Sequence, residues 1–202
     1  MVNDLKPYCF KLDYKIDHPR LMDSLTILMN RINQNIEVIH GRLSRYELVH
    51  GHMINLTHLP GLTGDDRFLK YSGKTGANLA QGIQEREFSE HLSETQDLYI
   101  GQVIRDLYAQ HNRKFQGRVM LIWMGPGQRY GWHRDLGSKT RYHVPLITNK
   151  ECYFQFKDND QEVYQVHLPT STAWYIDPNT LEHTFINNSD VPRLHLMLTN
   201  GW

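Results

Sequence analysis

The second half of the chain contains eight short runs of apolar and β-branched residues, and no helical pattern separates them. Typical turn sequences, such as KDND at 157–160 and DPN at 177–179, lie between several of these runs. Short strands at even spacing favour an antiparallel sandwich, barrel or jelly roll over a parallel α/β fold. The eight predicted strands are 117–124, 130–133, 141–147, 152–156, 162–168, 172–176, 183–186 and 194–198.

The first half of the chain has a different pattern, which predicts two helices. Asp17 and Pro19 supply an N-cap residue and a proline for the first turn, and apolar residues then recur at helical spacing over 21–36. A second helix is expected over 95–110, with the capping-box sequence SETQ at 93–96. A short strand is expected near Ile54.

These patterns divide the chain near Phe115. We expect residues 1–114 to form a helical and loop region that packs on a β core of residues 115–202. A chain of 202 residues is long enough to bury one substantial core, so we expect the two regions to form one structural unit.

Composition excludes several functional classes. Lys and Arg together number 22, as do Asp and Glu, and this balance argues against a strongly basic nucleic-acid-binding protein. The chain has only 2 cysteines, too few for a disulfide framework. No signal-peptide pattern and no apolar run of membrane-spanning length occur in the sequence. We therefore expect a cytoplasmic protein without a membrane or nucleic-acid partner; the sequence does not indicate its oligomeric state.

The 12 histidines make metal chemistry worth considering, and three residues of the β half suit it. His133 and Asp135 are two positions apart, so an extended chain presents both side chains on one face. His183 follows fifty residues later, at the start of another predicted strand. Two imidazoles and one carboxylate form the facial triad of non-haem Fe(II) oxygenases, which leaves positions open for oxygen and a cosubstrate. A structural zinc site would instead need four closed ligands, often cysteines.

An H-x-D sequence alone is a weak signal, but three further residues strengthen it. Arg193 lies on the last predicted strand, ten positions after His183, and an arginine there suits bidentate binding of a ligand carboxylate. Arg141 and His143 are two positions apart on the strand after the H-x-D sequence, so both side chains point to the same face. We therefore expect these three residues to bind a cofactor in the same interior as the metal.

Two aromatic residues precede His133 closely. Tyr130 and Trp132 are expected at the mouth of the site, where a contact with substrate and ordinary core packing are equally good interpretations. No catalytic residue beyond the metal ligands is indicated.

Two stretches of the sequence resemble one protein family. GQRYGWHRDLGSKTRYHVPLITN and HLPTSTAWYIDPNTLEHTFINNSDVPRLHLML are similar to the aspartyl/asparaginyl β-hydroxylase family of Fe(II)- and 2-oxoglutarate-dependent dioxygenases. The resemblance covers about 115–202 and is looser upstream. It implies a mainly β fold, a double-stranded β-helix or cupin-like jelly roll, with flanking N-terminal helices.

The resemblance also implies roles for the residues singled out above. His133 and His183 match the iron-binding histidines, and Arg193 matches the arginine that holds the distal carboxylate of 2-oxoglutarate. Arg141 and His143 match basic residues near the carboxylates of the cosubstrate. Some family members lack the carboxylate ligand, whereas this chain has Asp135 in its place, so we expect a complete triad.

The function implied is hydroxylation of an amino-acid side chain of the Asp, Asn or Pro type, free or in a peptide or protein. Fe(II), 2-oxoglutarate and O2 would take part, and 2-oxoglutarate would be decarboxylated to succinate. Two alternatives stay open: a metal-binding cupin with other chemistry, such as an isomerase or a cosubstrate-free dioxygenase, and a non-catalytic jelly-roll binding module. Arg193 argues against the first alternative and the intact triad against the second.

Overall fold

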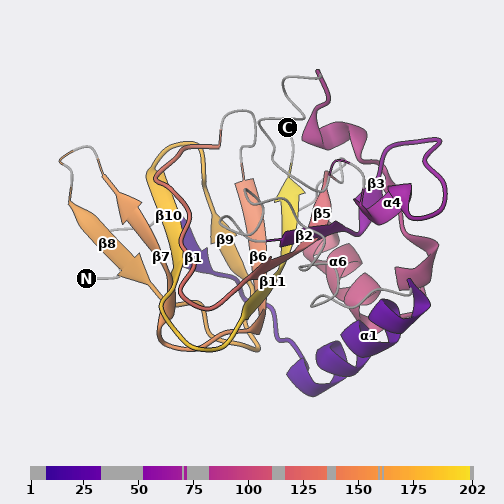
Figure 1. Cartoon of the computed structure of the whole chain (residues 1–202), viewed down its shortest axis with the longest axis horizontal. Helices are drawn as coiled ribbons and strands as arrows, with labels where there is room; N and C mark the ends of the chain where they lie inside the picture. Colours follow the sequence, from indigo (N-terminus) through magenta and orange to yellow (C-terminus); the bar gives the residue numbers. More distant parts are fainter. Residues whose placement is uncertain are drawn as a thin grey trace.

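The computed structural model describes residues 8–32, 52–69, 71, 82–110, 117–135, 140–158, 160 and 162–200. The first half contains β1 (Cys9–Lys11), α1 (His18–Arg31), β2 (His52–Asn55), β3 (Thr57–His58), α4 (Asp66–Leu69), the 3-10 turn η2 (Glu85–Glu87), β4 (Glu90–His91), the 3-10 turn η3 (Ser93–Thr95) and α6 (Tyr99–Gln110) (Figure 1). The second half contains β5 (Val119–Met124), β6 (Thr140–Ile147), β7 (Cys152–Lys157), β8 (Val163–Val166), β9 (Trp174–Ile176), β10 (Glu182–Asn187) and β11 (Arg193–Asn200).

Two antiparallel sheets form the body of the protein (Figure 1). The main sheet has six strands in the order β1-β9-β6-β11-β5-β2, and a smaller sheet has the order β10-β7-β8. A two-stranded pair, β3-β4, forms a third sheet. The inner faces of the two larger sheets pack on each other, because the ring of His143 on β6 meets that of Phe154 on β7 at 5.1 Å between centroids. This mainly β, cupin-like jelly roll is the fold class expected from the sequence.

Seven of the eight predicted strands are present, and no helix interrupts them in the described part of the second half. The expectation of a strand over 130–133 is wrong, because this segment forms only isolated bridges beside β10. Tyr130 and His133 each donate a backbone hydrogen bond to β10, but Gly131 lies between them, and glycine weakens a strand. The segment therefore follows β10 without forming a continuous ladder.

The first half of the chain contributes both outer strands of the main sheet. β1 pairs with β9, and β2 pairs with β5, with Ile54 opposite Leu121. The short strand expected near Ile54 is thus confirmed. The predicted boundary at Phe115 lies outside the described residues, and the division into 1–114 and 115–202 stays a prediction.

The predicted start of the first helix is confirmed. The side chain of Asp17 caps α1 by accepting a hydrogen bond from the backbone N–H of Arg20 at 3.2 Å, and Pro19 lies in the first turn. α1 ends at Arg31, so the predicted extension toward Ile36 falls outside the described residues.

The second predicted helix begins later than expected. α6 starts at Tyr99, and 93–95 forms a separate 3-10 turn without the predicted capping box. The reason is that the Ser93 hydroxyl donates to the carboxylate of Glu94 rather than capping the backbone. The carboxylate of Glu94 is itself held by Arg67 at 2.6 Å.

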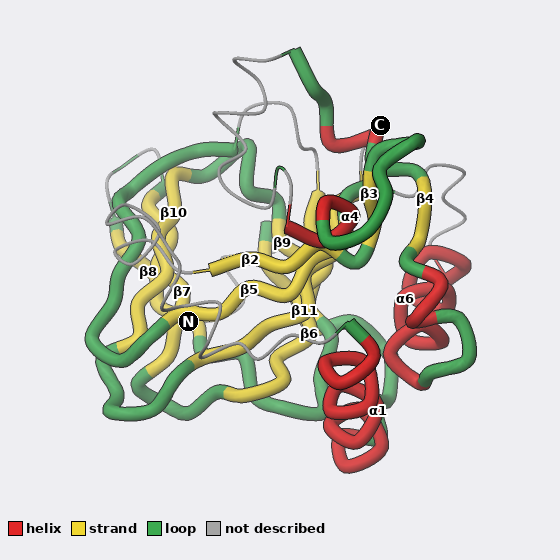
Figure 2. Tube along the Cα trace, turned by 45° about the vertical axis from the view of Figure 1, so that its right-hand side comes forward, coloured by secondary structure: helices red, strands yellow, loops and turns green. Residues whose placement is uncertain are grey.

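The helices α1 and α6 cover the outer face of the main sheet (Figure 2). Leu25 and Leu28 of α1 pack with Ile104 of α6 and with Leu196 of β11 in one buried apolar cluster. This face is closed by leucine, isoleucine and valine, and the buried arginines of the main sheet, Arg141 and Arg193, lie on its inner face. The inner face is therefore where a functional site has room for charge.

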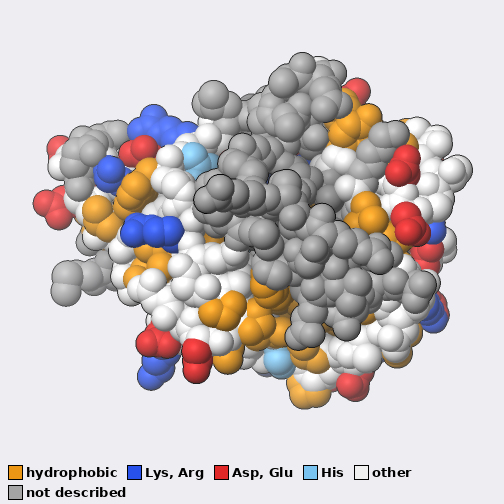
Figure 3. Space-filling model, viewed as in Figure 1, with side chains coloured by type: hydrophobic (Ala, Val, Ile, Leu, Met, Phe, Trp, Pro, Cys, Tyr) orange, Lys and Arg blue, Asp and Glu red, His pale blue; other side chains and the backbone are white. Residues whose placement is uncertain are grey.

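The described part of the face in Figure 3 shows no dominant charge. Both signs of charge occur over the described part of the face in Figure 3, in keeping with the formal net charge of +0. None of the helices in the described residues is long and apolar enough to cross a membrane.

Gly101 offers a test of how tightly α6 packs. Replacing an exposed glycine in a helix by alanine usually stabilises the protein. A Cβ at Gly101, however, would lie 2.0 Å from the backbone oxygen of Thr95. We expect Gly101→Ala to lower the melting temperature by about 3–10 °C, since overpacking costs about 1–3 kcal/mol. The matched variant Gln102→Ala, at the exposed next position, should leave the melting temperature unchanged. A stabilised Gly101→Ala variant would contradict this packing.

Candidate metal centre

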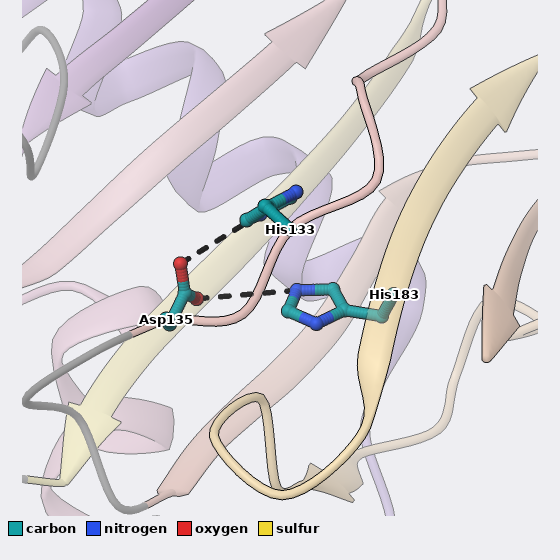
Figure 4. A group of neighbouring side chains, drawn as sticks. All are labelled: His133, Asp135 and His183. Atoms are coloured by element: carbon teal, nitrogen blue, oxygen red, sulfur yellow. Dashed lines mark ion pairs between the residues drawn. The ribbon is translucent and has the colours of Figure 1, made fainter. Parts of the chain in front are cut away.

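The three predicted metal ligands come together in the structure (Figure 4). His133 and Asp135 lie on the segment between β5 and β6, and His183 lies on β10. The backbone N–H groups of His133 and His183 each donate to the other's carbonyl oxygen, at 3.0 and 2.9 Å. The N–H of Asp135 donates to the carbonyl of Pro178 at 2.9 Å. One ligand atom from each of the three side chains lies within 4.8 Å of the others.

The separations within this group suit a single bound ion. His133 Nε2 lies 3.6 Å from Asp135 Oδ1, and His183 Nε2 lies 4.0 Å from Asp135 Oδ2. Metal bonds to nitrogen and oxygen ligands are about 2.1 Å long, so two ligands of one ion lie at most about 4.2 Å apart. Both pairs lie within this limit, and the two imidazoles and one carboxylate are the donor set that suits the metal implied by the sequence resemblance.

Backbone carbonyls orient both imidazoles. His133 Nδ1 lies 2.7 Å from the carbonyl of Gly131, and His183 Nδ1 lies 3.3 Å from that of Leu181. A carbonyl can only accept, so each Nδ1 carries the proton and each Nε2 presents its lone pair. This is the arrangement that metal-binding histidines normally have.

His183 is held in the neutral form. Burial lowers the pKa of His183 to about 4, although the nearby Asp135 opposes the shift. At neutral pH the ring is uncharged and can bind a metal without first losing a proton. His183 is buried, whereas the side chains of His133 and Asp135 are 29% and 15% exposed, so the group is open on one side.

Arg141 lies beside the metal ligands. Its Nη2 is 2.9 Å from Asp135 Oδ2 and 3.3 Å from Glu85 Oε1. Burial opposes the charge of Arg141, but Asp135 and Glu85 outweigh this effect and raise its pKa. The sequence placed Arg141 near a bound cosubstrate; in the structure its neighbours are the candidate ligand Asp135 and a second carboxylate.

Glu85 is a residue that the sequence analysis missed. It lies on η2, in the first half of the chain, and its side chain is only 10% exposed. It reaches Arg141 from 56 positions away, and no local motif marks it. Only the three-dimensional contact shows that the first half supplies a carboxylate next to the candidate metal centre.

Arg193 lies deep between the two sheets. It is 2% exposed, and its guanidinium carbon lies 5.1 Å from the ring centre of Phe154 and 5.3 Å from that of Phe185. Burial lowers the pKa of Arg193 to about 10, which still leaves it charged at neutral pH. Within the part of the chain that the structure describes, no carboxylate lies within ion-pair distance of it.

Phe185 connects Arg193 with the candidate metal centre. Its ring centre is also 5.9 Å from that of His183 and 6.0 Å from that of His133. The ring thus lies close to both histidines and to the guanidinium. The predicted metal ligands and the predicted carboxylate-binding arginine therefore belong to one interior.

His143 shares this interior. It is 2% exposed, and its ring meets Phe154 at 5.1 Å and His195 at 5.8 Å between centroids. Burial keeps the pKa of His143 well below its usual value. Its Nδ1 is buried without a hydrogen-bond partner among the described residues, as is Nε2 of His195.

His195 was not predicted, although a signal for it existed. It follows Arg193 by two positions on β11, and the same alternation that joined His133 to Asp135 places both side chains on the inner face. In the sequence RLHLML it reads as part of an ordinary core strand.

The two aromatic residues near His133 differ in their surroundings. Tyr130 packs on Phe185 at 5.0 Å and on His133 at 5.5 Å between ring centroids, so it lies beside the candidate ligands. Trp132 instead lies under Lys157, with Nζ 4.5 Å from the ring centre. Of the two, Tyr130 is the one that contacts the metal-binding group.

Fold and site together define a jelly-roll protein with a candidate two-histidine, one-carboxylate metal centre. Residues 80–200, more than half of the chain, match the aspartyl/asparaginyl beta-hydroxylase family, and the chain belongs to that family. The resemblance noted from the sequence is thereby confirmed, and the chain is a member of a hydroxylase family.

The structure of one solved protein supports the fold. A prolyl-4-hydroxylase from Pseudomonas putida is similar over 100% of this chain and 97% of its own, with a TM-score of 0.58 and 9% identity. A cupin domain from Bordetella pertussis Tohama I matches 42% of this chain and 80% of its own, with a TM-score of 0.34 and 23% identity. No curated protein sequence matches the chain.

Replacing His183 tests the metal centre. We expect His183→Ala to lose metal binding while a cooperative thermal transition remains, because the variant removes a ligand but little of the apolar core. Titration of the apo-protein with Fe(II) or Mn(II) under argon measures the first effect, and calorimetry measures the second. His167→Ala, which removes a half-buried histidine from outside the metal group, should bind metal normally. Normal metal binding by His183→Ala would exclude this centre.

Proposed function

We propose that the protein is an Fe(II)- and 2-oxoglutarate-dependent dioxygenase that hydroxylates an amino-acid side chain and releases succinate and CO2. The observation that carries the proposal is the buried guanidinium of Arg193, which has no carboxylate partner among the described residues and shares an interior with His133, Asp135 and His183.

The argument from Arg193 is energetic. A buried charge without a counter-ion costs several kcal/mol in a folded protein. Evolution rarely keeps such a cost without a use, and an arginine suits bidentate binding of a carboxylate. A keto acid with a second carboxylate at its far end would satisfy the metal and Arg193 together. 2-Oxoglutarate has this chemistry.

Each residue then has a separate task. His133, Asp135 and His183 would hold Fe(II), which when bound supplies the activation of O2 that these side chains cannot provide. Arg193 binds and orients the distal carboxylate. Phe154 and Phe185 line the interior with apolar surface, which excludes water and strengthens the ion pair.

Arg141 and Glu85 balance charge beside the metal. When Asp135 takes part in metal binding, Glu85 still lies against Arg141 and compensates its charge. Arg141 in turn lies where a second group of the cosubstrate would approach the metal, as the family resemblance implies. His143, neutral and with a free ring nitrogen among the described residues, is suited to a hydrogen bond in the same region.

The substrate in this proposal is an amino acid of the Asp, Asn or Pro type, either free or within a peptide or protein. The reaction is proposed to take place in the cytoplasm. Tyr130 is the residue we place at the substrate side, because it is half-buried and packs on His133. Trp132 contributes at most to the outer rim. A cupin with other chemistry or a non-catalytic binding module would have no need for both Arg193 and the triad.

The experiment is an anaerobic titration of the apo-protein with Fe(II) and then with 2-oxoglutarate, followed in the visible spectrum. A new metal-to-ligand charge-transfer band on addition of 2-oxoglutarate is expected, because the keto acid would bind the iron directly. Iron binding without the band would exclude 2-oxoglutarate and favour a cupin of other chemistry. Failure to bind iron would leave a jelly roll that binds something else.

Arg193→Met separates function from stability. The variant keeps an unbranched apolar stem in place of the arginine but removes the charge, so we expect the affinity for 2-oxoglutarate to fall by at least about a hundredfold while Fe(II) binding is kept. The ligand-free variant should also melt at a higher temperature than the wild type, because an unpaired buried charge has been removed. Equal weakening of both ligands would contradict the assignment, and a clear loss of stability would make Arg193 a structural residue.

A further inference from the structure

His195 accepts the hydrogen bond that Arg193 makes within the described residues. The two side chains project from β11 on the same face, and Arg193 Nη2 lies 3.0 Å from His195 Nδ1. Both are buried, His195 at 1% exposure. The contact therefore holds the guanidinium from one side, deep between the sheets.

The chemistry of the pair determines where the imidazole proton lies. A guanidinium has donors only, so Nδ1 of His195 must be the acceptor and the proton must lie on Nε2. Burial, reinforced by the nearby Arg193, keeps the pKa of His195 well below its usual value, and the ring is neutral. Its Nε2–H is then a buried donor without a hydrogen-bond partner among the described residues.

Two other arginines of the described residues are held differently. Arg67 pairs with the carboxylate of Glu94 at 2.6 Å, and Arg31 pairs with that of Asp97 at 2.5 Å. A carboxylate fixes a guanidinium but also cancels its charge. A neutral imidazole fixes the guanidinium and leaves the full positive charge for another anion.

We propose that His195 is a positioning residue for cosubstrate binding, orienting Arg193 toward the distal carboxylate of the keto acid without neutralising it. The inference rests on the proposed function, since it takes 2-oxoglutarate as the ligand of Arg193. It goes further by assigning the selectivity for a dicarboxylate to a pair of residues rather than to the arginine alone. His195 itself acts through Arg193 and not on the reacting atoms.

Three variants of the full chain test the proposal. His195→Phe keeps a ring of similar size and removes both nitrogens. His195→Asn places an amide oxygen near the position of Nδ1, where it can accept from Arg193. His58→Phe is the matched control, because His58 is also a buried histidine but lies on β3, in the separate two-stranded sheet.

The measurement is the dissociation constant of two keto acids for the Mn(II)-loaded protein under argon, by calorimetry. 2-Oxoglutarate carries the distal carboxylate, and 2-oxobutyrate has the same keto-acid head without it. For His195→Phe we expect binding of 2-oxoglutarate to weaken by about ten- to a hundredfold, while 2-oxobutyrate binds as to the wild type. His195→Asn should recover most of the loss, and His58→Phe should bind both acids normally.

Other results would overturn the proposal. Binding of 2-oxoglutarate by His195→Phe within about twofold of the wild type would show that Arg193 needs no positioning. Equal weakening of both keto acids, or no recovery in His195→Asn, would assign His195 a general structural role. If the wild-type protein binds Mn(II) but neither keto acid, the proposed function itself fails, and that outcome is distinct from the others.

Discussion

The reciprocal backbone pairing of His133 with His183 is the contact on which the candidate metal centre depends. Each N–H donates to the other's carbonyl, so the two Cα atoms face each other across a narrow antiparallel pair and their side chains emerge on one side. The imidazole centres consequently lie 4.4 Å apart. Asp135 follows two positions later on the same extended segment and meets both rings. One short pairing thus converts residues fifty positions apart into a single ligand group.

Charge is distributed unevenly along the interior that begins at this pairing. Near the metal ligands, Arg141 is balanced by Asp135 and Glu85. Farther in, Arg193 meets only the neutral ring of His195 and the faces of two phenylalanines among the described residues. The interior therefore has one end whose charges are compensated and one end with a net positive charge. A ligand that carries an anionic group at its far end removes this imbalance.

Local patterns were enough to predict much of this structure. Alternating apolar runs marked seven strands, and the two-residue spacing of His133 and Asp135 marked their common face, because both signals depend only on strand periodicity. The 3-10 turn at 93–95 was missed because the Ser93 hydroxyl bonds to Glu94, and Arg67, which holds that carboxylate, is distant in sequence. Glu85 was missed for the same reason: its role comes from a tertiary contact and from no motif.

The position of Phe185 links the candidate metal ligands with Arg193. His183 and Phe185 are two positions apart on β10, so their side chains share one face of the strand. The strand that supplies a metal ligand therefore also supplies the ring beneath Arg193. On the function proposed here, a keto acid bound at the metal must extend past Phe185 before its far carboxylate meets the guanidinium. A shorter acid would fill the metal end and leave Arg193 buried without a counter-ion, at a cost of several kcal/mol. On this proposal, selectivity for a dicarboxylate would follow from a buried charge that the apolar rings keep away from water.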